Sequence, residues 1–224
     1  MRVAIMQPYL FPYGGYWRLL TECDTFVLFD CVQFPRRGRV HRCEIAPQTW
    51  LTLPLAPAPR AALIRDMTFA NNAPALMARQ VSRLPWATPR DTALRREVLG
   101  LLEAPTGNLV DLLETGLRLV AQALGARATI LRSSSLGVSP DLRRQDRVIE
   151  IAGRLGATHY LNAPGGRALY DAESFARHGL MLEFLPDYTG DIPSMLRALF
   201  ERPIDEIAHD IRQSAPGGGM AAEP

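Results

Sequence analysis

The sequence predicts an α/β fold, in which a mainly parallel sheet is flanked by helices and a helical insertion occupies the middle of the chain. Near the amino end, short apolar runs at residues 3–6 and 25–29 enclose an amphipathic segment at 16–22. That order of strand, helix and strand is typical of a parallel unit. The same order recurs near the carboxyl end, and the residues between the two units follow a helical period. These three observations indicate the fold class.

The middle of the chain begins with two predicted strands, at residues 50–55 and 62–69. Helical spacing of apolar residues then predicts helices at 72–84, 92–102 and 109–124. The third helix has the clearest pattern, since its leucines and valines recur every three or four residues and form one apolar stripe. We expect these helices to pack on the sheet.

The second parallel unit follows the helices. Apolar runs predict strands at residues 128–131, 159–162 and 180–184, and a helical pattern at 142–155 joins the first two of these strands. Pro203 is expected to open a last helix, because proline is favoured at the first helical position.

Length and composition favour one domain. The chain has 224 residues, of which 47% are hydrophobic, and this is enough to bury one full core. We expect a single α/β domain over residues 1–213, in which about 70–125 form a helical subdomain. Residues 214–224 are rich in glycine, alanine and proline and are expected to form a flexible tail.

The charged residues exclude several kinds of chemistry and partner. All 25 basic residues are arginine, so a lysine Schiff base and the lysine of a phosphate-binding P-loop are both excluded. Arginine forks, backbone amides or a metal would have to hold any phosphate or carboxylate. The formal net charge is only +2, so we expect no DNA partner.

The cysteines and the hydropathy indicate a cytoplasmic protein. The three cysteines are odd in number and lack CxxC spacing, which argues against a disulfide framework or a structural zinc site. No apolar run approaches the roughly 20 residues of a membrane span, so we expect no membrane insertion. The histidines lack the spacing of metal ligands, and no metal site is predicted. The sequence leaves the oligomeric state open.

An aromatic loop directly follows the first predicted strand, at residues 7–17. It combines two prolines and two glycines with several aromatic side chains that have polar tips. Such flat surfaces with hydrogen-bonding ends are typical of the edge of a binding pocket. Because ligands bind at the carboxyl ends of parallel strands, we predict that Gln7, Tyr9, Tyr13 and Tyr16 bind substrate.

The loop after the second predicted strand is rich in arginine. It begins with the carboxylate of Asp30 and also contains one amide and one imidazole. Arginine suits phosphate or carboxylate, and histidine can move a proton near neutral pH. We predict catalytic roles for Asp30, His41 and Arg42, with either Asp30 or His41 as the base, and substrate binding by Gln33 and Arg37. The alternative is an ordinary solvated basic loop.

Two further strand ends carry candidate binding groups. Ser134 follows the first strand of the second unit and can offer a hydroxyl to a ligand, although it can equally cap a helix. Gly165 and Gly166 follow the next strand and can expose amides to an anion; the alternative is a tight turn. With Tyr170, these residues complete the predicted substrate-binding set. We expect the strand-end loops to form one site.

Motifs near both ends of the chain carry a family resemblance. Near the amino end they are MQPYLFPYGGY at residues 6–16, DTF at 24–26, and DCVQ at 30–33 followed by Arg37, Gly38 and Arg42. Near the carboxyl end they are LGATHYL at 155–161, Gly165, Gly166, Tyr170, Asp171, Phe175 and Gly179. On these residues the chain resembles the WbqC-like family of bacterial proteins over nearly its whole length. It departs from the family pattern at His41, where asparagine is usual, and in a shortened aromatic segment at 84–86.

The resemblance implies modification of a small molecule. It suggests a transferase that moves an aminoacyl or acyl group to the amine of an amino sugar, in the biosynthesis of O-antigen, other surface polysaccharides or secondary metabolites. The implied partner is a small-molecule substrate such as a sugar nucleotide or an activated amino acid. Two alternatives stay open: an ATP-dependent ligase or nucleotidyltransferase that uses a nucleotide with Mg²⁺, and a non-catalytic metabolite-binding protein.

Overall fold

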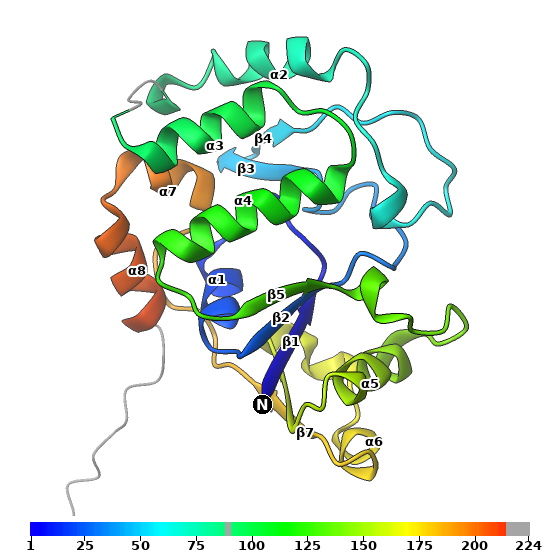
Figure 1. Ribbon diagram of the computed structural model, residues 1–224. Coiled ribbons are helices and arrows are strands. Elements are labelled where there is room, and N and C mark those ends of the chain that lie inside the picture. Colours follow the sequence, from blue (N-terminus) through cyan, green and yellow to red (C-terminus); the bar gives the residue numbers. More distant parts are fainter. Residues whose placement is uncertain (88–90, 214–224) are drawn as a thin grey trace, which may run out of the picture.

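The structure is a computed structural model in which residues 1–87 and 91–213 are described; the predicted tail at 214–224 lies outside them. Five strands form one parallel sheet in the order β5-β2-β1-β6-β7 (Figure 1). Their bounds are β1 Arg2–Met6, β2 Thr25–Leu28, β5 Thr129–Arg132, β6 His159–Asn162 and β7 Met181–Phe184. The predicted α/β class is therefore confirmed, and all five carboxyl ends meet at one edge of the sheet.

The side of β1 on which the chain adds new strands changes once. From β1 the chain adds β2 and then β5 on one side, and it crosses back to add β6 and β7 on the other side of β1. In open sheets of this kind, ligands bind in the crevice beside the carboxyl ends of the strands, near the point of reversal. A ligand site is therefore expected at the loops after β1, β2, β5 and β6.

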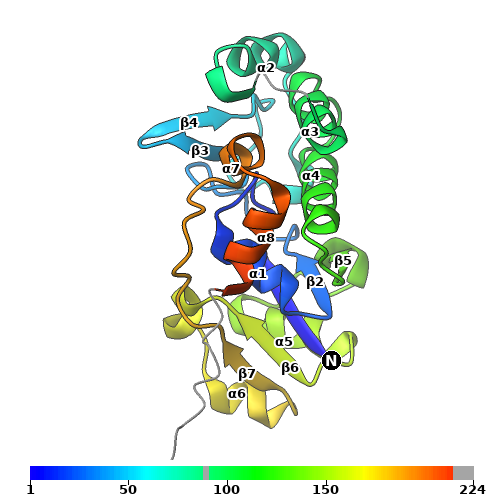
Figure 2. The same ribbon diagram turned by 90° about the vertical axis from the view of Figure 1, so that its left-hand side faces the viewer.

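Helices cover both faces of the sheet (Figure 2). One face is packed against α1 Gly14–Thr21, α4 Leu109–Ala123 and α8 Ile204–Gln213, and the other against α5 Arg144–Arg154 and α6 Ala172–Arg177. The alternation of side chains along a strand explains this division: Val3 and Ile5 belong to the core beneath α5 and α6, whereas Ala4 belongs to the core on the α1 face.

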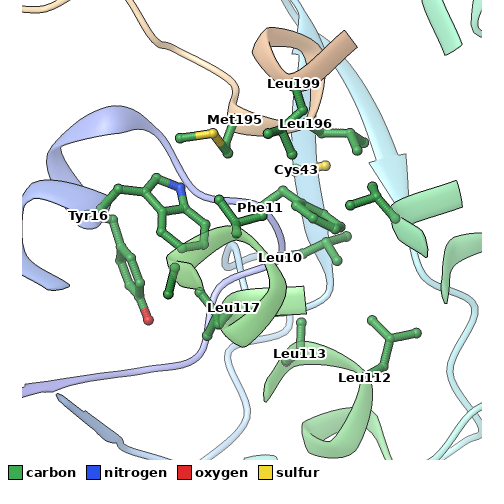
Figure 3. Close-up of a cluster of buried hydrophobic side chains, with 14 of the residues drawn as sticks. Leu10, Phe11, Tyr16, Cys43, Leu112, Leu113, Leu117, Met195, Leu196 and Leu199 are labelled. Carbon is green, nitrogen blue, oxygen red and sulfur yellow. The ribbon is translucent and has the colours of Figure 1, made fainter. Parts of the chain in front are cut away.

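The middle of the chain is helical, as predicted, and it also contains a hairpin. Its elements are α2 Ala73–Val81, α3 Ala93–Glu103, and the antiparallel strands β3 Arg42–Ala46 and β4 Thr49–Thr52, with α7 Met195–Glu201 packed beside them. Leu10 and Phe11 of the aromatic loop lie in the core between α4, β3 and α7 (Figure 3). The hairpin and the helices therefore share one continuous core with the α1 face of the sheet.

One of the predicted strands is wrong, and some elements were not predicted. Residues 62–69 do not form a strand: they contain a 3-10 turn at Ile64–Asp66, and the amides of Ile64 and Arg65 donate to the carbonyls of Val32 and Asp30. The predicted loop after Asp30 contains no strand element up to His41, and the strand β3 that follows it was not predicted; in β3, Cys43 and Ile45 alternate with half-exposed residues. The helix α7 was not predicted. No helix in the described part of the chain is both long and apolar enough to span a bilayer.

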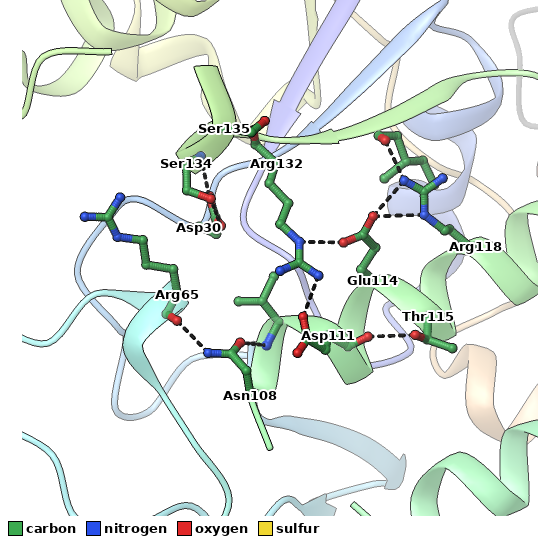
Figure 4. Close-up of polar contacts among 12 residues, drawn as sticks. Asp30, Arg65, Asn108, Asp111, Glu114, Thr115, Arg118, Arg132, Ser134 and Ser135 are labelled. Carbon is green, nitrogen blue, oxygen red and sulfur yellow. Dashed lines mark hydrogen bonds and ion pairs between the residues drawn. The ribbon is translucent and has the colours of Figure 1, made fainter. Parts of the chain in front are cut away.

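An ion-pair network joins α4 to the end of β5 (Figure 4). Arg132 Nε lies 2.5 Å from Glu114 Oε2, and Arg132 Nη2 lies 2.7 Å from Asp111 Oδ1. Arg118 contacts the other oxygen of Glu114 at 2.6 Å. Burial alone would raise the pKa of Glu114, but the hydrogen bonds from Arg118 and Arg132 outweigh it and hold that pKa below the ordinary value of 4.5.

The Glu114→Gln variant is expected to lose more stability near neutral pH than in acid. Because the folded pKa is depressed, Glu114 contributes its stability above pH 4.5 and loses it as the pH falls through the folded pKa. We expect a loss of about 1 kcal/mol at pH 7 and a smaller loss at about pH 3, since the contribution falls as the pH drops below 4.5. Urea unfolding at both pH values measures this, and Glu150→Gln is the control because Glu150 forms only an exposed pair with Arg154. An equal deficit at both pH values would contradict the network's role.

Candidate functional site

A cavity of about 740 Å³ opens at the carboxyl ends of β2 and β5. Four arginines line it and define what we call the arginine cavity: Arg65, Arg143, Arg144 and Arg147. Arg143 and Arg144 lie at the start of α5, and Arg65 comes from the 3-10 turn after the hairpin. No aspartate or glutamate occurs among the described residues that line the cavity. The cavity is therefore strongly positive and suited to an anionic ligand.

Arg147 is the most buried of the four arginines, with 8% of its surface exposed. Its Nη1 donates to the carbonyl of Cys31 at 2.8 Å, and its Nη2 donates to the carbonyl of Pro140 at 2.9 Å. Its Nε is buried and has no hydrogen-bond partner among the described residues. A buried donor without a partner is unfavourable, so a hydrogen bond from this nitrogen to an oxygen of a bound anion would relieve that cost.

Asp30 lies directly beneath the cavity, at the end of β2, and is 1% exposed. Its Oδ1 accepts hydrogen bonds from Ser133 Oγ at 2.8 Å and from the amide of Ser134 at 2.9 Å. Its Oδ2 accepts from Ser134 Oγ at 2.6 Å, and Figure 4 shows this pair beside Arg65. Both carboxylate oxygens are thus engaged, and Asp30 faces the cavity through the hydroxyl of Ser134, which lines it.

The structure brings three of the predicted site residues together at this cavity. Ser134 and Gln33 line it, and Asp30 supports it from below. The side-chain amide of Gln33 donates to the carbonyl of Arg60 at 2.8 Å, so its position is fixed by the neighbouring segment. Strands β2 and β5 are adjacent in the sheet, which explains why the residues after them meet.

Arg42, Arg37 and His41 lie apart from the cavity. The guanidinium of Arg42 stacks over the ring of Trp50 at 4.4 Å and donates to the carbonyls of Gly38 and Arg37. Arg37 is exposed. The His41 ring packs on another aromatic ring, and burial, reinforced by the charge of Arg42, lowers its pKa. These interactions hold the hairpin and the preceding loop in place.

The aromatic loop is mostly a packed structural element. Tyr16 is buried against the ring of Tyr9, and its hydroxyl donates to the carbonyl of Gln7 at 2.9 Å. Burial raises the pKa of Tyr16 well above its ordinary value. Tyr13 is the exception: it is partly exposed and lines a second cavity, of about 280 Å³, together with Gly165.

Gly166 and Tyr170 contact the sheet and not either cavity in the described part of the chain. A side chain at Gly166 would collide with the amide of Asn162, so glycine permits this close approach. The hydroxyl of Tyr170 lies 3.3 Å from that of Tyr160, in the core on the α5 face. The predicted strand-end loops therefore form two cavities and not one site.

The residues that the sequence reasoning missed are the cavity arginines, Cys31 and Ser133. Part of this set could have been found from the sequence. Arg143, Arg144 and Arg147 lie at the start of a predicted helix that follows a strand end, and parallel sheets bind ligands near such ends. Arg65 was hidden by the wrong strand prediction. Within residues 1–87 and 91–213, no group of three or more His, Cys, Asp or Glu is placed to hold a metal ion.

Comparison with known proteins identifies one family. The family model described as WbqC-like protein family matches residues 7–191, a span that contains the aromatic loop and both cavities. No curated protein and no solved structure matches the chain.

Proposed function

The chain belongs to the WbqC-like protein family, and from this premise we propose that it is a transferase whose substrate binds in the arginine cavity. The proposed reaction moves an acyl or aminoacyl group to the amine of an amino sugar or related metabolite, in polysaccharide or secondary-metabolite biosynthesis. The observation that carries the proposal is a roomy cavity lined by four arginines and no described carboxylate, with the Asp30–Ser134 pair at its base.

The cavity supports binding of a phosphorylated or carboxylated substrate. Its volume of about 740 Å³ lies within the range of small-molecule sites, roughly 300–1,000 Å³, and suits a ligand the size of a sugar nucleotide. The unpartnered Nε of Arg147 would meet one oxygen of the anion, and the exposed arginines at the start of α5 would meet others. The same positive charges would stabilise negative charge that develops on an acyl oxygen during the reaction.

The Asp30–Ser134 pair would accept the proton that the amine must lose. As the amine nitrogen bonds to the acyl carbon, the leaving group departs with its electron pair. The amine proton passes to Ser134 Oγ while the hydroxyl proton passes to Asp30 Oδ2, 2.6 Å away. Asp30 is the proposed base, since Arg42 and His41 lie apart from the cavity and hold the hairpin.

A nucleotide-dependent ligase is the second candidate function. The strand order β5-β2-β1-β6-β7 favours it, because doubly wound sheets with this pattern of reversal commonly bind nucleotides. Calorimetry with ATP, CTP and a UDP-amino sugar, each with and without Mg²⁺, separates the two functions. Magnesium-dependent ATP binding with release of AMP or ADP would favour the ligase, whereas binding of the amino sugar without Mg²⁺ would favour the transferase.

A direct assay tests the transferase proposal. The purified protein is incubated with an acyl thioester or aminoacyl adenylate together with a UDP-amino sugar, and the amide product is sought by mass spectrometry. The proposal expects amide formation that is lost in Asp30→Asn. A panel of such donors that yields no amide, from protein that binds the sugar nucleotide, would instead support a non-catalytic binding protein.

Labelling of Cys31 is expected to report occupation of the cavity. Cys31 lines the cavity, whereas Cys23 and Cys43 are buried and burial raises the pKa of each to about 12. Iodoacetamide should therefore modify Cys31 first. Pyrophosphate at ten times its Kd is expected to slow that modification about tenfold, because most protein molecules then have an occupied cavity. Peptide mass spectrometry measures the rate, and protection that persists in Arg147→Gln would contradict binding at this place.

A further inference from the structure

The second cavity, of about 280 Å³, lies at the carboxyl ends of β6 and β7. Helix α1 contributes to its wall, whereas α5 lines the arginine cavity. We call it the tyrosine cavity, after Tyr13 and Tyr188. No described residue lines both cavities, so the tyrosine cavity is a separate place that the proposed transfer reaction does not use.

Arg18 of α1 lines the tyrosine cavity and is almost completely buried, with 2% of its surface exposed. Its Nη1 donates long hydrogen bonds to the carbonyls of Pro186 and Asp187, at 3.2 and 3.4 Å. Its Nε is buried and has no partner. The edge of the guanidinium formed by Nε and Nη2 therefore makes no hydrogen bond to the described part of the chain.

The positive charge of Arg18 also lacks a counter-charge. No described carboxylate lies within ion-pair distance of it, and Glu22 and Glu183 in the adjoining depression pair with Arg2 at 4.0 and 2.7 Å. Asp187 lines the cavity, but it is exposed and offers Arg18 only its backbone carbonyl. A buried guanidinium without a paired carboxylate is unfavourable for the fold, so binding of an anion at Arg18 would be favourable.

The other walls of the tyrosine cavity include two aromatic rings and two prolines, beside the exposed Asp187. A side chain at Gly14 would collide with the Tyr188 ring, and one at Gly15 would collide with the Tyr13 ring, so these glycines permit both rings to pack there. The two rings meet edge to face at 6.3 Å, and the Tyr188 hydroxyl donates to Asp210. Such walls suit a small organic group attached to the anion.

We propose that the tyrosine cavity binds the carboxylate of a small organic acid, which Arg18 holds through its Nε–Nη2 edge. That edge presents two parallel N–H groups, the geometry that matches the two oxygens of a carboxylate. One guanidinium balances the single charge of a carboxylate, whereas the second negative charge of a phosphate dianion would have no partner at Arg18. The aromatic rings and the neighbouring prolines would contact the organic group of the acid.

The Arg18→Met variant tests this site, because methionine has similar length and no charge. Without added acid, we expect the variant to melt no lower than wild type, since an uncompensated buried charge has been removed. Acetate and glycine are expected to raise the Tm of wild type in a saturable way and to raise that of Arg18→Met by much less, because only the arginine cavity can then bind them. Inorganic phosphate at equal ionic strength should give no shift that depends on Arg18.

Two further variants complete the experiment. Arg147→Gln, in the arginine cavity, should keep the part of the acetate response that Arg18→Met loses, so failure of this site is distinguishable from failure of the proposed function. If Arg18→Met does not fold, Arg18→Lys replaces it and should weaken acetate binding at least about tenfold, since lysine lacks the planar fork. If acetate did not raise the Tm of wild type, or raised the Tm of wild type and of the Arg18 variant equally, the proposal would be overturned.

Discussion

Replacing Arg147 by methionine is expected to weaken pyrophosphate binding by about 30-fold or more, as is usual when one partner of a buried charged hydrogen bond is removed. Arg147 is the one cavity arginine that is buried, and its unpartnered Nε is already desolvated in the free protein. The anion therefore gains this hydrogen bond without the cost of removing water from the nitrogen. Titration calorimetry of both proteins at low salt measures the difference.

The matched control is Arg197→Met on α7. Arg197 is exposed and pairs with Glu201 at 2.8 Å, far from the cavity lining, so its loss changes the net charge by the same amount. If both variants lost affinity equally, the effect would be general electrostatics. If Arg147→Met bound pyrophosphate as wild type does, the arginine cavity would not be the anion site.

Replacing Asp30 by alanine is expected to destabilise the protein and abolish turnover. The substitution removes the acceptor for two serine hydroxyls and one backbone amide beneath the cavity. We expect a loss of about 3 kcal/mol, allowing for hydroxyls that turn toward water. This corresponds to a fall in Tm of roughly 6–12 °C for a chain of this size, which scanning calorimetry measures.

The Asp30→Asn and serine variants separate proton transfer from structure. Asparagine keeps the shape and most of the hydrogen bonds, so we expect a smaller loss of stability but no turnover, because an amide cannot accept the proton. Ser134→Ala should also lose turnover, whereas the neighbouring Ser135→Ala should not, since the Ser135 hydroxyl donates to the carbonyl of Arg132. Turnover retained in Asp30→Asn would make Asp30 a structural residue only.

The sheet and a smaller part of the candidate site could be predicted, because residues that follow parallel strands are confined to one edge of the sheet. Residues that follow adjacent strands in a parallel sheet must come close, and this argument correctly joined Asp30 with Ser134. It failed for Arg42 because the chain after Asp30 folds into a hairpin, whose short alternation of Cys43 and Ile45 is concealed by charged neighbours. Distance from a strand end along the sequence was therefore a poor guide to distance in space.

Buried arginines were the main features that sequence alone could not identify. On a helix, Arg18 and Arg147 look like ordinary polar residues beside an apolar stripe, and nothing in the spacing tells that they point inward. Their burial results from packing against loops that come from distant parts of the chain: the segment at 186–187 for Arg18, and Cys31 with Pro140 for Arg147. Only the tertiary structure reveals that each has an unpartnered nitrogen.

The most direct test of the central claim is a crystal structure of the protein soaked with pyrophosphate. We expect the anion in the arginine cavity, with one oxygen hydrogen-bonded to Arg147 Nε and others near Arg143 or Arg144. Pyrophosphate bound elsewhere on the protein, with the arginine cavity holding only water, would contradict it.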